Sequence, residues 1–342
     1  MVRAALSLAL LLAPAVAGAT IQFLEGTYPD GSAAPTEAYF SGEITSTSAT
    51  EVKQALERSR KKIGMLYLDS AGGDLVAGME LGDLVRQSGI NTSIGKHSEQ
   101  YGKPLPGTCY SACVLTFSGG HFRFAEKGSR IGIHRFYRRY ASSTDLDVGQ
   151  VVSAAITSYL MRMGVSQILF EKMAQVGGGK MQLLHLSEAT SLSLVNNGIL
   201  APKWGIEGKQ GTVYLKGEQE TWNGTGKLIV SCAGHNAVKV SALYDAGPNT
   251  RSIYQVTRGY SLRVNSQFLP IPKLLSDSSI SGDYLVASFT PDPAQLSDIQ
   301  SAEQIGFGFH PQSSDSFYGF LVDARSDREV IRSFISFCQA RD

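Results

Sequence analysis

The sequence has almost no excess of charge of either sign. Its 342 residues include 31 Lys and Arg against 30 Asp and Glu, which gives a formal net charge of +1 at pH 7. Non-specific binding to nucleic acid or to an anionic membrane draws on a surplus of positive charge, so this balance counts against a nucleic-acid-binding protein. Charged residues make up 18% and hydrophobic residues 43% of the chain, which is typical of a folded globular protein.

Patterns for metal and phosphate binding are missing as well. The 6 histidines show no HxxxH or HxH spacing, so we expect no metal site. The run Gly177–Lys180 is followed by Met181, and it lacks the Ser or Thr that a phosphate-binding loop requires. We therefore expect that the protein works without a cofactor.

Long apolar runs are absent except near the first residue, and that run is short. Arg3 precedes an apolar run from Ala4 to Val16, which ends in small residues. The run is shorter than the ~20 residues that span a bilayer, and its layout is that of a secretory signal peptide. We expect residues 1–19 to be removed, leaving a mature chain that has no stable membrane span and is periplasmic or secreted.

Cysteines are few: Cys109, Cys113, Cys232 and Cys338. Export permits disulfides, and four cysteines allow three pairings. The close spacing of the first two, and the position of the other two in the distal half, favour Cys109–Cys113 together with Cys232–Cys338. A reading of Cys109 and Cys113 as small buried residues stays open, because an i,i+4 pair lies near the upper limit of disulfide reach. A Cys₄ zinc site is disfavoured, since such sites are usually built from CxxC pairs.

The order of apolar segments divides the chain into two predicted domains. Residues 20–205 alternate strand-like runs with helix-period segments, an α/β pattern. Residues 206–342 contain short strand-like runs between clusters of turn-forming residues, which indicates a smaller β-rich domain of unknown role. The predicted strands are 37–43, 63–69, 91–94, 211–216, 227–231, 237–243, 284–289 and 317–322. The predicted helices are 48–60, 73–89, 112–117 and 150–175 with a break at Gly164, and in the second domain only 327–339.

Three short segments of the first domain contain the residue types that acyl transfer needs. The turn Ser70–Gly73 has paired glycines, which let the backbone bend and present N–H groups at a helix start, where negative charge is stabilised. The segment Gly107–Cys113 places Ser111 at the start of an apolar helix, and a strand-like run carries His134. Taken singly, these features are more often a simple turn, a helix N-cap and a structural histidine. Together they supply every part of an acyl-transfer site except one.

Residues from about 38 to 200 resemble the ClpP/crotonase superfamily, specifically its exported ClpP-like serine peptidases. The resemblance follows the family's order of motifs: a strand ending in Ser-x-Gly-Gly, a small-x-Ser-small turn before an apolar helix, and a strand carrying His. The segments of this chain that match are Ser70–Gly73 with Ala77–Met79, the turn at Ser111 with Phe122–Phe124 after it, Ile133-His134, and the closing stretch from Leu186–Ala189 to Gly198–Leu200.

The resemblance implies an α/β fold of repeated ββα units and a serine-type peptidase that acts through an acyl-enzyme on peptide or protein substrates. Because ATP is scarce outside the cytoplasm, export implies that the peptidase works without an ATPase partner. It makes Ser111 the nucleophile and His134 the general base. It assigns the oxyanion hole to the backbone N–H groups of Gly73 and Ala112. It also implies a capacity to form homo-oligomers.

The resemblance is incomplete at the third member of the triad. The family places an acid just before the closing stretch, and this chain has none at the corresponding residues Gln182, Leu183 and Leu184. The orienting partner of His134 is left open between Gln182, a backbone carbonyl and an acid from elsewhere, such as Asp145, Asp147 or Glu188. The missing acid supports an alternative, a catalytically weak or dead ClpP-like scaffold whose second domain binds a partner. Acyl-CoA chemistry of the crotonase kind is disfavoured, because CoA thioesters are cytoplasmic.

Overall fold

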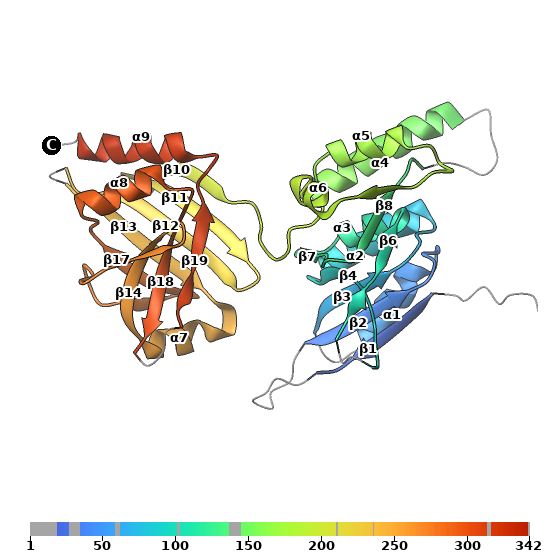
Figure 1. Cartoon of the computed structure of the whole chain (residues 1–342), viewed down its shortest axis with the longest axis horizontal. Coiled ribbons are helices and arrows are strands. Elements are labelled where there is room, and N and C mark those ends of the chain that lie inside the picture. The colour runs from blue at the N-terminus through green and yellow to red at the C-terminus, as the bar shows by residue number, and fades with distance from the viewer. Residues whose placement is uncertain are drawn as a thin grey trace, which may run out of the picture. The chain divides into compact units, whose positions relative to one another are not determined.

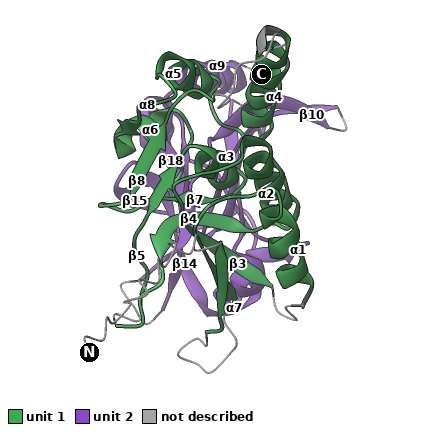
Figure 2. Cartoon of the chain, turned by 90° about the vertical axis from the view of Figure 1, so that its right-hand side faces the viewer, with its two compact units in different colours: residues 1–197 green, residues 198–342 purple. Residues whose placement is uncertain are grey.

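The computed structural model describes residues 19–26, 35–58, 62–100, 103–136, 145–209, 211–234, 236–312 and 316–340. The chain divides into two compact units, residues 1–197 and 198–342 (Figures 1 and 2). All but the last residue of the predicted signal peptide lies outside the described residues. In the described part of the chain, no helix is long and apolar enough to cross a membrane.

The first unit mixes strands and helices, as the α/β pattern predicts. Its elements in chain order are β1 (Thr20–Leu24), β2 (Thr36–Ser41), α1 (Ser48–Arg58), β3 (Ile63–Asp69), α2 (Leu75–Gln87), β4 (Asn91–Lys96), β5 (Leu105–Pro106), β6 (Thr108–Tyr110), α3 (Ala112–Ser118), β7 (Arg123–Phe124), β8 (Arg130–Ile133), α4 (Asp145–Arg162), α5 (Ile168–Gln175), β9 (Gln182–Leu184) and α6 (Leu186–Ser191).

The main sheet of this unit has the order β1-β2-β3-β4-β5, with β7 also paired to β4. Strands β2, β3, β4 and β7 run parallel, while β1 and β5 pair antiparallel at the two ends of the order. Helices join the parallel strands, because a parallel pair requires a crossover connection. The predicted strand 63–69 is confirmed residue for residue as β3, and it buries Leu66 and Leu68 in the core.

Helix α2 starts and ends where its sequence supplies the signals. The Asp74 side chain accepts a hydrogen bond from the backbone N–H of Ala77 at 2.8 Å, which caps the first turn. Ala77, Leu81 and Val85 lie four residues apart on one face and are buried. The predicted helix 73–89 is therefore confirmed with shorter ends.

A second, smaller sheet of the first unit contains β6, β8 and β9. Strand β6 is parallel to β8, and β9 is antiparallel to it. The predicted long helix after residue 150 is two helices, α4 and α5. Gly164 has a φ of 68° between them, which confirms the predicted break.

The second unit is β-rich, as predicted. Its elements are β10 (Lys203–Lys209), β11 (Thr212–Thr221), β12 (Gly224–Cys232), β13 (Val238–Asp245), the 3₁₀ turn η1 (Gly247–Asn249), α7 (Thr250–Val256), β14 (Thr257–Val264), β15 (Gln267–Pro270), β16 (Ser279–Ser281), β17 (Tyr284–Phe289), α8 (Pro293–Ser301), β18 (Gln304–Pro311), β19 (Tyr318–Asp323) and α9 (Arg328–Gln339). The boundary expected between residues 205 and 206 falls inside β10, which pairs along its whole length with β11.

Two antiparallel sheets build this unit, in the orders β10-β11-β12-β13-β17-β16 and β15-β14-β18-β19. Alternate residues of both sheets meet in one hydrophobic core, which contains Leu228 and Val230 of β12 and Phe307 of β18. The prediction that only 327–339 is helical is wrong, because α7 and α8 are helical as well. Helix α8 begins with a capping box between Asp292 and Gln295, a local signal that the turn-rich context concealed.

Both favoured cysteine pairs are bonded. Cys232 of β12 and Cys338 of α9, 106 residues apart in sequence, form one disulfide. Cys109 and Cys113 form the other, with Cα atoms 5.2 Å apart, inside the range that a disulfide accommodates. The alternative interpretation, in which Cys109 and Cys113 are unbonded small residues, is therefore wrong. Two disulfides fit an oxidising compartment.

Candidate active site

Backbone hydrogen bonds bring the three predicted segments of the site together. Ser70, at the end of β3, donates its N–H to the carbonyl of Thr108 at 2.7 Å and accepts from the N–H of Tyr110 at 3.0 Å. Tyr110 in turn lies opposite Gly132 in the parallel pairing of β6 with β8. The carboxyl ends of β3, β6 and β8 therefore lie side by side, and the turns that follow them converge.

Ser111 sits at a sharp turn between β6 and α3. Its backbone has φ 55° and ψ −124°, an uncommon conformation for any residue other than glycine. Its N–H donates to the carbonyl of Gly132 at 2.9 Å, which continues the strand pairing up to the turn. The next residue already belongs to α3, so the serine side chain projects from a strand-to-helix corner.

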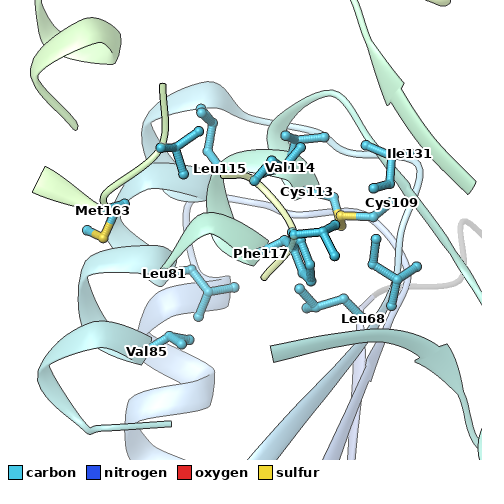
Figure 3. Close-up of a cluster of buried hydrophobic side chains, with 14 of the residues drawn as sticks. Leu68, Leu81, Val85, Cys109, Cys113, Val114, Leu115, Phe117, Ile131 and Met163 are labelled. Carbon is cyan, nitrogen blue, oxygen red and sulfur yellow. A yellow bond between two sulfur atoms is a disulfide. The ribbon is translucent and has the colours of Figure 1, made fainter. Parts of the chain in front are cut away.

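Helix α3 is held rigidly beneath this turn. Every one of its residues is buried, and Figure 3 shows Val114, Leu115 and Phe117 in one hydrophobic cluster with Leu68, beside the Cys109–Cys113 disulfide. A short helix is marginal in isolation, so α3 depends on this packing. The cluster fixes the position of the turn that carries Ser111.

His134 follows β8 and contacts Ser111. Its Nε2 lies 2.7 Å from the Oγ of Ser111, and its Nδ1 lies 2.8 Å from the carbonyl oxygen of Arg135. A carbonyl only accepts hydrogen bonds, so in the neutral ring Nδ1 carries the hydrogen and donates it. Nε2 is then the acceptor for the serine O–H. This tautomer is the one in which histidine can take a proton from serine.

The first of the paired glycines lies against the same turn, and the second lies against Ile44. Gly72 has φ +101°, and a Cβ built on it would lie 2.7 Å from the Cβ of Ser111 and 3.1 Å from the N of Ala112. Gly73 has φ +147°, and a Cβ there would overlap the carbonyl of Ile44. Both positions therefore require glycine, because of the backbone conformation and because of the close approach.

The two N–H groups expected to form the oxyanion hole belong to Ala112, which follows Ser111 directly, and to Gly73, which follows the glycine packed against Ser111. Ala112 is the first residue of α3, so its N–H is one of those that a helix leaves without an intrahelical acceptor. Gly73 forms a parallel β-bridge with Ile44. The Ile44 N–H donates to the carbonyl of Gly72, and the Asp74 N–H donates to the carbonyl of Ile44. In such a parallel bridge the N–H of Gly73 points away from Ile44. Donors of this kind, preorganised near a helix start, can stabilise a developing oxyanion.

The side chains expected as possible orienting partners of His134 belong to different elements of the first unit. Gln182 belongs to β9 and is paired with Ile133, one residue before the histidine. Glu188 forms an ion pair with Lys172 at 2.9 Å. Asp147 lies on α4 with an exposed side chain, and the side chain of Asp145 is outside the described residues. A backbone carbonyl, one of the alternatives left open, does contact Nδ1 of His134; it belongs to Arg135, which no side-chain pattern could identify.

A cavity of about 150 Å³ is lined in part by Arg135, the residue that follows His134 in the sequence. Phe170, Met173 and Ala174 of α5 make one wall, and Arg135, Phe136 and Ser153 complete the lining. Its lining is therefore mostly apolar, with one cation. The volume is several times the ~30 Å³ that one water molecule occupies in the liquid. Within the described residues, no group of three or more His, Cys, Asp or Glu side chains is arranged to hold a metal ion.

Arg123 and Arg86 bind backbone carbonyls at the carboxyl end of α3. No sequence pattern marked either arginine as functional. Arg123 is 3% exposed, and burial together with the nearby Arg86 lowers its pKa to about 10. Both guanidinium groups are satisfied by main-chain oxygens rather than by carboxylates. Arg123 donates to the carbonyls of Gly120 (2.9 Å), Met163 (3.1 Å), Ser193 (2.7 Å) and Leu194 (2.9 Å). Arg86 donates to Gly119 (2.9 Å), Gly120 (3.0 Å) and Met163 (3.2 Å). Cations at a helix carboxyl end stabilise the helix dipole.

A second Ser–His contact exists in the other unit, and its setting is different. The Oγ of Ser261 lies 2.8 Å from Nε2 of His310. Ser261 is 3% exposed in the middle of β14, with no turn and no helix start beside it. Desolvation by burial, with the charge of Arg263, holds the pKa of His310 below its usual range. We interpret this pair as a partly buried structural hydrogen bond.

Comparisons with known proteins give partial likenesses of fold. No family model matches the chain, and no curated protein sequence matches it. Among solved structures, a serine-to-alanine mutant of the 1510-N membrane-bound stomatin-specific protease is 19% identical, with a TM-score of 0.36 over 46% of this chain and 75% of that chain. A ClpP1 mutant from Listeria monocytogenes is 20% identical, with a TM-score of 0.35 over 47% of this chain and 88% of that chain.

A third solved structure, a lysine-to-alanine mutant of the 1510-N protease in complex with a substrate peptide, is 20% identical. Its TM-score is 0.36 over 46% of this chain and 71% of that chain. At these TM-scores the likenesses carry no inference about activity.

Proposed function

We propose that this protein is an exported, ATP-independent serine peptidase in which Ser111 is the nucleophile and His134 the general base. One observation supports the proposal above all others: the 2.7 Å contact between the serine Oγ and the histidine Nε2. That contact occurs at a strand-to-helix turn of unusual conformation, next to N–H groups that can receive negative charge.

The proposed reaction uses these groups in order. His134 Nε2 accepts the proton of the Ser111 hydroxyl while Oγ attacks the scissile carbonyl carbon. The carbonyl oxygen becomes an oxyanion, which the N–H groups of Gly73 and Ala112 stabilise. The imidazolium then protonates the leaving amine as the C–N bond breaks, and water releases the acyl group by the same steps. The Arg135 carbonyl keeps the proton on Nδ1, the role that an acid has in a triad.

The cavity lined by Arg135 and Phe136 suggests which peptides such a site would accept. Its walls from α5 are apolar, so we propose that an apolar side chain near the scissile bond enters it. Arg135 at the same cavity adds an attraction for an acidic group further along the peptide. Export of the mature chain and assembly into homo-oligomers are part of the proposal, and the two disulfides support export.

The test is covalent labelling of the purified protein with a fluorophosphonate, which forms a phosphorus–oxygen bond to an activated serine and loses fluoride. We expect labelling at Ser111 that Ser111→Ala abolishes and that His134→Ala slows by about 10²–10⁴-fold. Ser261→Ala is the matched control, because Ser261 also contacts a histidine but lies buried in a strand. It should leave labelling unchanged.

Absence of labelling in a folded wild-type protein would contradict the proposal. The chain would then be a ClpP-like scaffold, and the second unit would become the place to look for a bound partner.

A further inference from the structure

The disulfide of the first unit encloses the proposed nucleophile. Cys109 lies two residues before Ser111, in β6, and Cys113 lies two residues after it, in α3. The bond therefore joins the strand that enters the turn to the helix that leaves it. Cys109 and Cys113 are 1% and 0% exposed, so the bond lies inside the hydrophobic cluster under the turn (Figure 3).

The turn lacks the stabilisation that a helix start usually has. A serine at this position ordinarily accepts a hydrogen bond from the helix backbone with its hydroxyl. The Ser111 side chain makes no such cap bond, and its Oγ contacts His134 instead. Its φ of 55° is also a conformation that persists only where the surroundings hold it. Something other than local capping must keep the turn in place.

Two attachments do so from opposite sides. On the strand side, the Ser111 N–H donates to the Gly132 carbonyl at 2.9 Å. On the helix side, the covalent link between Cys109 and Cys113 closes a ring of five residues with Ser111 at its centre. Since the ring spans both ends of the distorted backbone, it restricts the very torsions that direct the Ser111 side chain.

We propose that the Cys109–Cys113 disulfide is a positioning element of the active site, which holds the Ser111 hydroxyl against His134. This inference rests on the proposed peptidase function for its effect on rate, although the effect on geometry is independent of it. The site is then fully assembled only when the bond is formed, as it is in an oxidising compartment.

The experiment compares two paired substitutions. Cys109→Ala/Cys113→Ala removes the bond around Ser111, and Cys232→Ala/Cys338→Ala removes the other disulfide from the second unit as a matched control. For each folded protein, the rate of fluorophosphonate labelling and the saturation constant for the probe are measured. We expect the first pair to slow labelling at saturation by about 10²-fold, the effect of a reacting group displaced by about 1 Å, with little change in the saturation constant. The control pair should label at the wild-type rate.

A second readout separates this proposal from the peptidase proposal. The ring protons of His134, followed by NMR and assigned with His134→Ala, report the contact with Ser111 whether or not any reaction occurs. We expect the signal in Cys109→Ala/Cys113→Ala to move as it does in Ser111→Ala, and to stay in place in the control pair. A wild-type protein that is not labelled would refute the peptidase function alone. An unmoved His134 signal would overturn the role of the disulfide.

If Cys109→Ala/Cys113→Ala does not fold, the control variant supplies the comparison, because Cys109–Cys113 is its only disulfide. Dithiothreitol reduces that bond to two thiols and closes to its own cyclic disulfide, and thiol alkylation reports the extent. The same shift of the His134 signal is expected on reduction. A fully reduced protein with an unmoved signal overturns the proposal.

Discussion

Replacing Gly72 by alanine tests whether the close approach of the two turns sets the reacting geometry. The added Cβ would lie 2.7 Å from the Cβ of Ser111 and 2.7 Å from the carbonyl oxygen of Tyr110. Unbonded carbon atoms normally stay about 3.5–4.0 Å apart. The Ser111 turn or the glycine turn must therefore move by about 1 Å to relieve the overlap.

The size of the effect follows from that movement. A misplacement of about 1 Å in a catalytic group lowers the rate by about 10²-fold. In addition, the φ of +101° at position 72 is one that alanine adopts at a cost of about 1–3 kcal/mol. We thus expect Gly72→Ala to label with fluorophosphonate about 10²-fold more slowly than the wild type and to unfold at a lower denaturant concentration.

Gly89→Ala is the matched control. Gly89 also has a positive φ, +64°, but no atom lies within 4 Å of the position its Cβ would take. It should lower the stability by about 1 kcal/mol and leave the labelling rate of the folded protein unchanged. Equal labelling rates for Gly72→Ala and Gly89→Ala, measured on protein shown to be folded, would refute the reasoning. The contact between the turns would then have no influence on Ser111.

Two further predictions concern stability. Arg123→Lys removes most of the hydrogen bonds to buried carbonyls, because a lysine cannot reach several acceptors at once. We expect the free energy of unfolding, measured in urea, to fall by about 2–4 kcal/mol. An unchanged unfolding midpoint would contradict this prediction. The pKa of His310 is held below its ordinary 6.5, so the folded state binds fewer protons than the unfolded state just below that pH. The stability of the wild type relative to His310→Gln should therefore fall as the pH drops below about 6.5, and a difference independent of pH would contradict it.

Sequence patterns singled out the three segments of the candidate site because they use residue types with narrow conformational roles. The turn Gly72-Gly73 is visible as two adjacent glycines after an apolar strand, and both have positive φ. Ser111 is visible at the start of an apolar helix, and His134 at the end of a strand-like run. Regular periodicity likewise predicted α2 and the break at Gly164. In these cases the local sequence and the fold agree.

Other parts of the site and fold had no local signal. The Arg135 carbonyl is main chain, and every residue has one, so no side chain marks its contact with Nδ1 of His134. The support of α3 by Arg123 joins residues up to 71 positions apart through hydrogen bonds to carbonyls, which leave no pattern. Helices α7 and α8 are short and lie between strands, where turn-forming residues such as Pro293 obscure their start.

The backbone conformation of Ser111 distinguishes a serine that only caps a helix from a serine with a functional role. If the serine served only to cap α3, its hydroxyl would accept a bond from the helix and its backbone would adopt an extended conformation. Instead the backbone has φ 55°, the hydroxyl contacts His134, and the cap bond is missing. A fold keeps such a departure from the locally favoured state only where the surroundings hold it, and sites of this kind concentrate where a side chain has chemistry to perform. Here the hydrogen bond to the Gly132 carbonyl and the Cys109–Cys113 bond hold the turn, while Gly72 packs against it and the buried helix α3 supports it, so that all of them bear on one hydroxyl group.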